Sequence, residues 1–343
     1  MKRFMEQIVC NDGLKNRICS DILSGSFSHA YIIEGVRGSG KHTIARLAAA
    51  ALSCERRSDE LSPLPCGKCE ACRKILGFLS PDVITVGAEG KATIGVDSVR
   101  FMREDVYTVP NDLDHKIYII EDADKMTTQA QNAFLLTLEE PPAYVGFILL
   151  CENAGALLET IRSRAPIMRT EPVSREDIDK YITDNDKRAA SLKTTSPNDY
   201  AELLAASENG IGKALLLLDQ KALSPVLEKR KLVKDFILLA LGNCSHKEAL
   251  ALLTRFSQKR EPLSEELKLI HIALRDLTVL KKSENAELCF YETKDVALDV
   301  SESARTSELF KLMSAVSEAI DSISRNANVK LTMISLMSEI GML

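Results

Sequence analysis

Residues 31–47, YIIEGVRGSGKHTIARL, join a short apolar run to a glycine-rich turn and a helix-like pattern. Residues 31–33 suit a buried strand, and the apolar residues from Ile44 onward recur at helical spacing. Backbone amides of such a turn can converge on a phosphate at the positive end of the following helix. The segment therefore predicts a nucleotide-binding loop rather than an ordinary glycine turn. Its candidate binding residues are Gly35, Gly38, Ser39, Gly40, Lys41, His42 and Thr43.

One position of this loop departs from the usual pattern. Lys41 should be followed by Ser or Thr, whose hydroxyl holds magnesium, but the chain has His42, and Thr43 comes one place late. We therefore expect ATP or ADP to bind, with a poorly formed magnesium site and with weak or absent hydrolysis.

Composition sets the wider limits. With 343 residues, of which 45% are apolar, the chain is long enough for about two or three domains with buried cores. A net charge of −5 argues against a protein that coats nucleic acid unaided. The sequence has no apolar run long enough for a membrane helix and no signal-type N-terminus, which predicts a cytoplasmic protein without a membrane partner.

Four of the nine cysteines follow the spacing C-x11-C-x2-C-x2-C. Without an export signal, such clustering indicates metal or free thiols rather than disulfides. Four thiolates with no position for water predict a closed structural zinc site. Free thiols and an iron–sulfur cluster remain the alternatives. The predicted ligands are Cys54, Cys66, Cys69 and Cys72.

A second strand signal ends in acidic residues. The apolar run 117–120 is followed by Glu121 and Asp122, and acids at the end of such a strand orient magnesium and activate water in nucleotide hydrolases. The usual order is Asp then Glu, so this degenerate pair again predicts weak catalysis. Alternatively, the two acids only end the strand and lead into the next helix.

The remaining pattern predicts an α/β domain followed by helices. A helix over 127–138 should end before Pro141 and Pro142, and a further apolar strand covers 146–151, which together favour a doubly wound parallel sheet. Ser224–Pro225 suggests a boundary before a helical domain. Apolar residues three and four apart then predict helices over 226–241, 247–257, 264–280, 306–323 and 328–343.

Four segments in this order resemble the AAA+ clamp-loader subunits of bacterial DNA polymerase III. They are SHAYIIEGVRGSGK, the four cysteines, DHKIYIIEDADKMTTQAQNAFLLTLEEPP and ETIRSRAP. The resemblance implies an α/β AAA+ P-loop domain over 1–172, a RecA-like parallel sheet with a zinc knuckle near 54–72. It further implies a small all-α lid over 173–222 and an all-α collar over 223–343, where the last helix is either core or subunit seam.

In that family, the subunits form a ring that uses ATP to open the sliding clamp and load it on primed DNA. The implied partners are the other clamp-loader subunits (gamma/tau and delta), the sliding clamp and primer–template DNA. His42 and the Glu121–Asp122 order resemble the delta-prime subunit, a stator with weak or no ATPase activity, more than the active gamma/tau ATPase. A free-standing P-loop phosphotransferase is a distant alternative.

The resemblance also assigns roles to single residues. Arg164, in Ser163-Arg164-Ala165, matches the arginine finger that acts in trans on a neighbour's ATP; without the resemblance, it reads as a local ion pair. Lys213 falls near the lid's phosphate-sensing arginine, or is a solvated lysine. Arg100 and Arg103 follow a helix start that faces DNA phosphates in the ring, or lie on a solvated helix face.

Overall fold

The computed structural model describes residues 8–59, 62–88, 90, 92–242, 245–283 and 286–343. These residues fall into two compact units. One consists of Met1–Asp177 with Asn209–Gly212, and the other of Ile178–Glu208 with Lys213–Leu343. Within the described ranges, no helix is long and apolar enough to cross a membrane.

The first unit is built on a five-stranded sheet in the order β2-β3-β4-β1-β5, and all neighbouring strands are parallel. The predicted parallel sheet is thus confirmed, with two short edge strands in addition to the three that were predicted. The strands are β1 (Ala30–Glu34), β2 (Val83–Val86), β3 (Lys116–Ile120), β4 (Val145–Cys151) and β5 (Ile167–Arg169).

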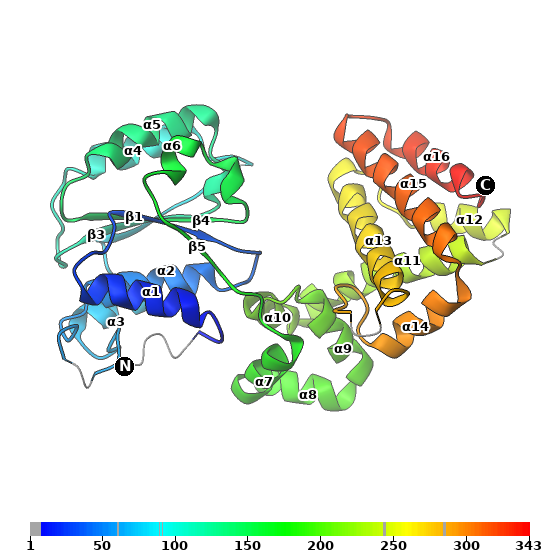
Figure 1. The fold of residues 1–343 in the computed structure, drawn as a ribbon, viewed down its shortest axis with the longest axis horizontal. Coiled ribbons are helices and arrows are strands. Elements are labelled where there is room, and N and C mark those ends of the chain that lie inside the picture. The colour runs from blue at the N-terminus through cyan, green and yellow to red at the C-terminus, as the bar shows by residue number, and fades with distance from the viewer. Residues whose placement is uncertain (1–7, 60–61, 89, 91, 243–244, 284–285) are drawn as a thin grey trace. The chain divides into compact units, whose positions relative to one another are not determined.

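Helices cover both faces of this sheet (Figure 1). Successive strand residues point to opposite faces, so Ile33 packs in one core and Ile32 in the other. Because both cores need apolar residues, the central strands are apolar except for Glu34 at the end of β1 and Lys116 at the start of β3. One face carries α1 (Asp12–Leu23), α2 (Lys41–Leu52) and α3 (Glu70–Leu76), and the other α4 (Val96–Asp105), α5 (Thr128–Glu139) and α6 (Glu159–Arg162).

The carboxyl ends of β1, β3 and β4 lead into the segments that the sequence singled out. The glycine loop follows β1, and two short 3₁₀ helices, η1 (Ala123–Lys125) and η2 (Ala154–Ala156), follow β3 and β4. Thr127 caps α5 by accepting a hydrogen bond from the Ala130 amide at 3.2 Å. Parallel strands bring all three loops to one edge of the sheet.

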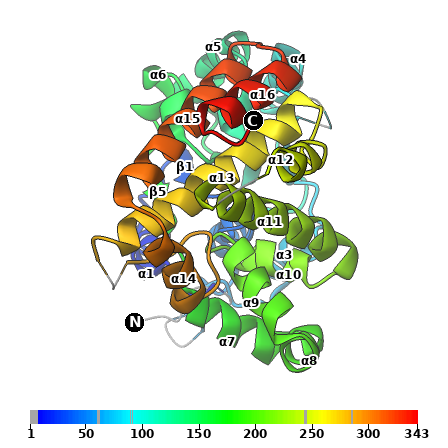
Figure 2. The ribbon, with the colours of Figure 1, turned by 90° about the vertical axis from the view of Figure 1, so that its right-hand side faces the viewer.

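The second unit is helical (Figure 2). Its helices from α11 onward share an apolar core that includes Phe236, Leu274 and Val316. Five of its predicted helices are present, whereas α14 was not predicted. The remaining helices of the chain are α7 (Arg175–Asn185), α8 (Lys187–Thr195), α9 (Pro197–Ala206), α10 (Ile211–Leu217), α11 (Gln220–Leu241), α12 (His246–Leu253), α13 (Arg260–Leu280), α14 (Lys294–Ser303), α15 (Thr306–Ser324) and α16 (Val329–Glu339).

The boundary expected between residues 222 and 223 lies inside α11. This helix runs from Gln220 to Leu241 with Pro225 within it, and the Asp219 side chain caps its start by accepting from the Lys221 amide at 2.9 Å. The Ser224–Pro225 step therefore does not interrupt the helix. The division of the chain into domains over 1–172, 173–222 and 223–343 stays a prediction.

Candidate functional site

The glycine loop between β1 and α2 is folded tightly against its surroundings. A Cβ atom on Gly35 would lie 1.9 Å from Thr170 Oγ1, so only glycine fits there. Gly40 has a φ of 86° and begins α2 without a side-chain cap. The loop thus presents backbone at the start of a helix, as phosphate binding requires.

Lys41 turns back onto the loop itself. Its Nζ donates hydrogen bonds to the carbonyls of Gly35 at 2.6 Å and Val36 at 2.9 Å, and the residue is only 7% exposed. Burial lowers the pKa of Lys41, and the nearby Glu152 opposes that shift. The Ser39 hydroxyl beside it is buried without a partner among the described residues. Before Lys41 could reach a phosphate, it would have to leave both carbonyls.

His42 and Glu121 contact each other directly. His42 Nδ1 lies 2.9 Å from Glu121 Oε1, which joins the position after the loop lysine to the first acid after β3. In active nucleotide hydrolases these two positions meet through magnesium. Asp122, the second acid, has a left-handed backbone with φ of 49° and forms an ion pair with Lys125 at 2.8 Å. Thr43, the hydroxyl residue that comes one place late, is exposed on α2. The pair His42–Glu121 thus occupies the region where magnesium would bridge loop and strand.

Cys151 and Asn153 lie at the end of β4. Cys151 is buried, and burial raises its pKa to about 12. The Asn153 side chain caps η2 by accepting from the Gly155 amide at 2.8 Å.

A segment distant in sequence closes on the glycine loop from outside. The Gly212 amide donates to the Gly38 carbonyl at 3.2 Å, and a Cβ on Gly210 would lie 2.9 Å from that same carbonyl group. Only a residue without a side chain can approach so closely. Lys213, which follows this segment, forms an ion pair with Glu208 at 2.5 Å.

Arg164 follows α6 and is held by two neighbours. Its Nη1 donates to the Thr160 carbonyl at 3.0 Å, and its Nη2 contacts Glu139 Oε1 at 2.9 Å at the end of α5. The side chains of Arg164 and Glu139 are 38% and 48% exposed, so the pair lies at the surface. The sequence analysis singled out Arg164 but not its partner.

Gln131, another residue that the sequence analysis missed, supports the segment before Arg164. It is 4% exposed; its Nε2 donates to the carbonyls of Met126 and Ala156, and its Oε1 accepts from the Leu158 amide at 2.7 Å. The available sequence signal was its helical spacing, three and seven residues before Phe134 and Leu138, but its partners depend on the fold.

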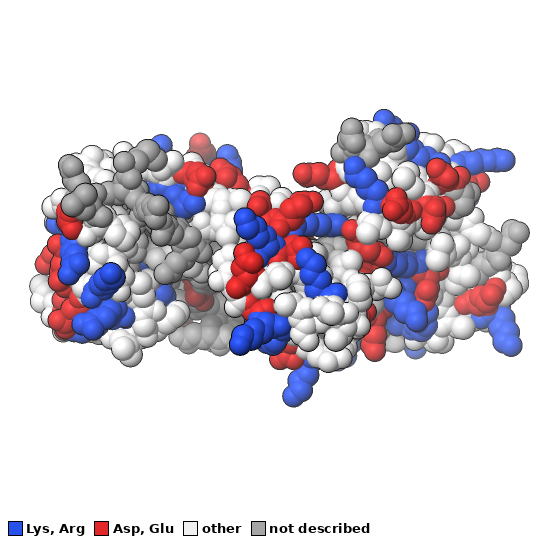
Figure 3. Space-filling model, turned by 90° about the horizontal axis from the view of Figure 1, so that it is seen from below, with Lys and Arg blue, Asp and Glu red and all other residues white. Residues whose placement is uncertain are grey.

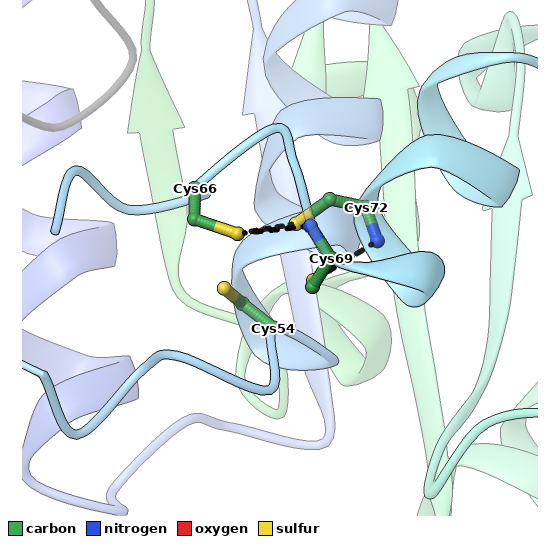
Figure 4. A group of neighbouring side chains, drawn as sticks. All are labelled: Cys54, Cys66, Cys69 and Cys72. Atoms are coloured by element: carbon green, nitrogen blue, oxygen red, sulfur yellow. Dashed lines mark hydrogen bonds between the residues drawn. The ribbon is translucent and has the colours of Figure 1, made fainter.

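The four clustered cysteines come together beside α2 and α3 (Figure 4). All are buried, and their sulfur atoms lie within 4.8 Å of one another. The Sγ atoms of Cys66 and Cys72 are 3.9 Å apart, close to the ~3.8 Å between two sulfurs that bind one tetrahedral zinc ion. The donor set and its size therefore fit zinc.

Local structure prepares these thiols to act as ligands. The Cys69 amide donates to Cys66 Sγ at 3.3 Å and the Cys72 amide to Cys69 Sγ at 3.5 Å. Although burial alone would raise the pKa of Cys66, backbone amides outweigh it and lower the pKa to about 7, whereas burial raises the pKa of Cys72. Amide donors to sulfur are the outer support that holds a thiolate in place.

The candidate DNA residues lie apart from these sites on α4. Arg100 is exposed and pairs with Asp97 at 3.4 Å, and Arg103 is exposed near the helix end. On the face of the molecule shown in Figure 3, acidic and basic side chains are interspersed.

Comparison with known proteins gives consistent matches. The sequence profile of the family described as "DNA polymerase III, delta subunit" matches residues 10–174. The chain is 35% identical over 158 residues to DNA polymerase III subunit gamma of Buchnera aphidicola subsp. Schizaphis graminum, covering 46% of this chain and 42% of that protein. It is 32% identical over 217 residues to subunit tau of Bacillus subtilis, covering 63% and 37%. A solved gamma subunit-related protein of Thermotoga maritima aligns over 96% of this chain and 98% of that chain, with 19% identity and a TM-score of 0.46.

The chain thus spans less than half the length of these curated relatives, at 42% and 37%. The matched residues 10–174 contain the glycine loop, the four cysteines and Arg164, all in the unit with the parallel sheet. The parallel sheet with helices on both faces, followed in the chain by a helical unit, agrees with the α/β class of fold that the resemblance implied. Residues 10–174, just under half of the chain, match the family described as DNA polymerase III, delta subunit, and the chain is similar in sequence to gamma and tau subunits.

Proposed function

We propose that this chain is a clamp-loader subunit of the DNA polymerase III holoenzyme, of the delta-prime type. It helps load the sliding clamp on primer–template DNA as a member of a cytoplasmic ring with gamma/tau and delta subunits. Its own ATPase activity is weak or absent, and Arg164 acts as an arginine finger on the ATP of a neighbouring subunit. The family match supports the clamp-loader role.

The contact between His42 and Glu121 supports the delta-prime type most directly. A protonated or neutral imidazole at 2.9 Å from the carboxylate takes a place that a magnesium ion needs in an active site. Lys41 is held by two carbonyls, which further disfavours engagement of a terminal phosphate. Any ATP or ADP in this loop would therefore bind without well-coordinated magnesium.

ATP turnover tests this proposal. The purified chain alone should turn over ATP no faster than its Lys41→Ala variant, while the complex assembled with gamma/tau and delta should hydrolyse ATP. Arg164→Ala should leave assembly intact and slow hydrolysis by the complex. Turnover by the isolated chain that disappears in Lys41→Ala would overturn the delta-prime assignment.

A gamma/tau-type ATPase is the second candidate. Its support is that the chain is similar to curated gamma and tau subunits and retains Gly35, Gly40 and Lys41 of the loop. The same turnover measurement distinguishes it. The free-standing phosphotransferase has no comparable support, because the family model and the curated relatives named above are of DNA polymerase III subunits.

We also propose that the four buried cysteines hold a structural zinc ion. No position in a four-thiolate set remains for water, so the ion would stabilise the 54–72 segment rather than take part in chemistry. Elemental analysis should find about one zinc per chain, and its absence would remove this assignment. Contact of Arg100 and Arg103 with DNA stays a prediction, as does a phosphate contact of Lys213.

A further inference from the structure

We propose that Glu139 is a resting-state partner of Arg164 that competes with the phosphates of a neighbouring subunit's ATP for its guanidinium. This inference rests on the proposed role of Arg164 in trans. Neither the sequence nor the comparisons give Glu139 a role. Here its role is to set how readily the Arg164 guanidinium is released to bind a phosphate.

The two ends of the guanidinium are held differently. Nη1 donates to the Thr160 carbonyl at 3.0 Å and to Ser163 Oγ at 3.5 Å, which holds this edge of the guanidinium against the end of α6. Nη2 donates to a carboxylate among the described residues, Glu139 Oε1 at 2.9 Å. Exchange of that carboxylate for a phosphate leaves the Thr160 contact in place. The exchange of Glu139 for a phosphate at Nη2 therefore needs little movement of the backbone.

Glu139 is poorly placed to stabilise its own helix. It is the last residue of α5, where the partial negative charge of the helix end disfavours a carboxylate. The next residues, Glu140 and the prolines at 141 and 142, end the helix without it. The contact with Arg164 is thus the main interaction that the Glu139 carboxylate gains in this structure.

The pair is suited to exchange. With side chains 38% and 48% exposed, the charges stay hydrated, and an exposed ion pair adds little stability. A triphosphate carries more negative charge than one carboxylate, and its oxygens accept hydrogen bonds from a guanidinium as carboxylate oxygens do. Glu139 therefore occupies the Arg164 guanidinium in the resting state, and a terminal phosphate can still displace the Glu139 carboxylate.

The test compares Glu139→Gln, Glu140→Gln and Arg164→Ala in the fully assembled complex, with steady-state ATP hydrolysis as the readout. Glu139→Gln keeps the size and most of the polarity of the side chain but removes the competing charge. We expect it to lower KM for ATP by about two- to five-fold with kcat unchanged within about two-fold. Glu140→Gln, one residue further along and also exposed, should change neither.

The double variant Glu139→Gln/Arg164→Ala completes the experiment. It should behave as Arg164→Ala alone, because Glu139 acts only through Arg164. If Arg164→Ala slows hydrolysis while Glu139→Gln leaves KM unchanged or lowers kcat, the competition is wrong and the arginine finger stands. If Arg164→Ala has no effect on hydrolysis, both the finger and this inference are wrong.

Discussion

His42 determines what the glycine loop can do with a metal. Its imidazole contacts Glu121 at 2.9 Å, so a magnesium ion would have to displace one member of the pair. We predict that ATP or ADP binding by the chain is the same in magnesium and in EDTA, and that His42→Thr makes binding magnesium-dependent. Titration with a fluorescent nucleotide measures both.

The matched control for this variant is His29→Thr, an exposed histidine just before β1. It should bind nucleotide as the unmodified chain does. Tenfold tighter binding in magnesium by the unmodified chain would contradict the displacement of the metal by His42.

Asp105 makes the stability of the first unit sensitive to acid. Although burial alone would raise the pKa of Asp105, hydrogen bonds from Lys116 at 2.9 Å and Tyr118 at 2.8 Å outweigh it and lower the pKa. Its stabilisation is therefore present above the unfolded pKa of about 3.9 and is lost as pH falls through the lower folded value.

We predict that Asp105→Asn reduces the free energy of unfolding at pH 7 by about 1–3 kcal/mol, because Lys116 stays buried with only its carbonyl partners. The difference from the unmodified chain should shrink below about pH 4, as urea unfolding at several pH values can measure. Asp97→Asn, with a 93% exposed side chain, serves as the control and should have little effect at any pH. A constant difference across pH would contradict the linkage.

At the scale of elements, Gln131 connects α5 to the segment that leads to Arg164. Its three hydrogen bonds reach the carbonyls of Met126 and Ala156 and the Leu158 amide. Gln131→Ala leaves these buried groups without partners, so we predict a loss of about 1–3 kcal/mol in the free energy of unfolding. Asn132→Ala, at the neighbouring exposed position, should cost much less in the same denaturation experiment.

The four-cysteine element should depend on its metal. We predict that Cys69→Ser reduces the zinc content and lowers the melting temperature, because a closed site loses one of four ligands. Cys289→Ser, an exposed cysteine in the other unit, should change neither quantity. Equal zinc content in both variants would contradict the assignment of Cys69 as a ligand.

The sequence predicted those elements whose pattern is fixed locally. Strands β1, β3 and β4 are continuous apolar runs because helices cover both faces of the sheet. The edge strand β2 has residues that are mostly half-buried and an exposed Thr85, so its pattern is weak. The helix α11 passes through Pro225 because packing of Val233 and Phe236 outweighs a local break.

The sequence predicted which residues belong to the candidate site but not which of them contact each other. Spacing alone identified the four cysteines, since short loops force them together. By contrast, the contact of His42 with Glu121 and that of Arg164 with Glu139 join residues 79 and 25 positions apart. Such pairs depend on side-chain direction and on the order of strands, which a single sequence does not fix.

At the scale of the whole molecule, each unit has its own apolar residues in a core and its own buried polar site that stabilises it. Zinc would stabilise only the unit with the sheet. In the other unit, Arg230 is 3% exposed, contacts Glu202 and the Phe290 carbonyl, and lies 4.3 Å from the centre of the Phe290 ring. Removal of one member of such a buried set is costly because it leaves the partners uncompensated.

We therefore predict two transitions in calorimetric unfolding. Chelation of zinc should lower one midpoint, and Arg230→Met should lower the other, since the two sites lie in different units with separate apolar clusters. Lys187→Met, on the exposed surface of α8, should move neither and controls for the loss of a charge. If chelation and Arg230→Met both shift a single transition, the two units unfold as one cooperative body, and zinc stabilises the helical unit as well as the sheet.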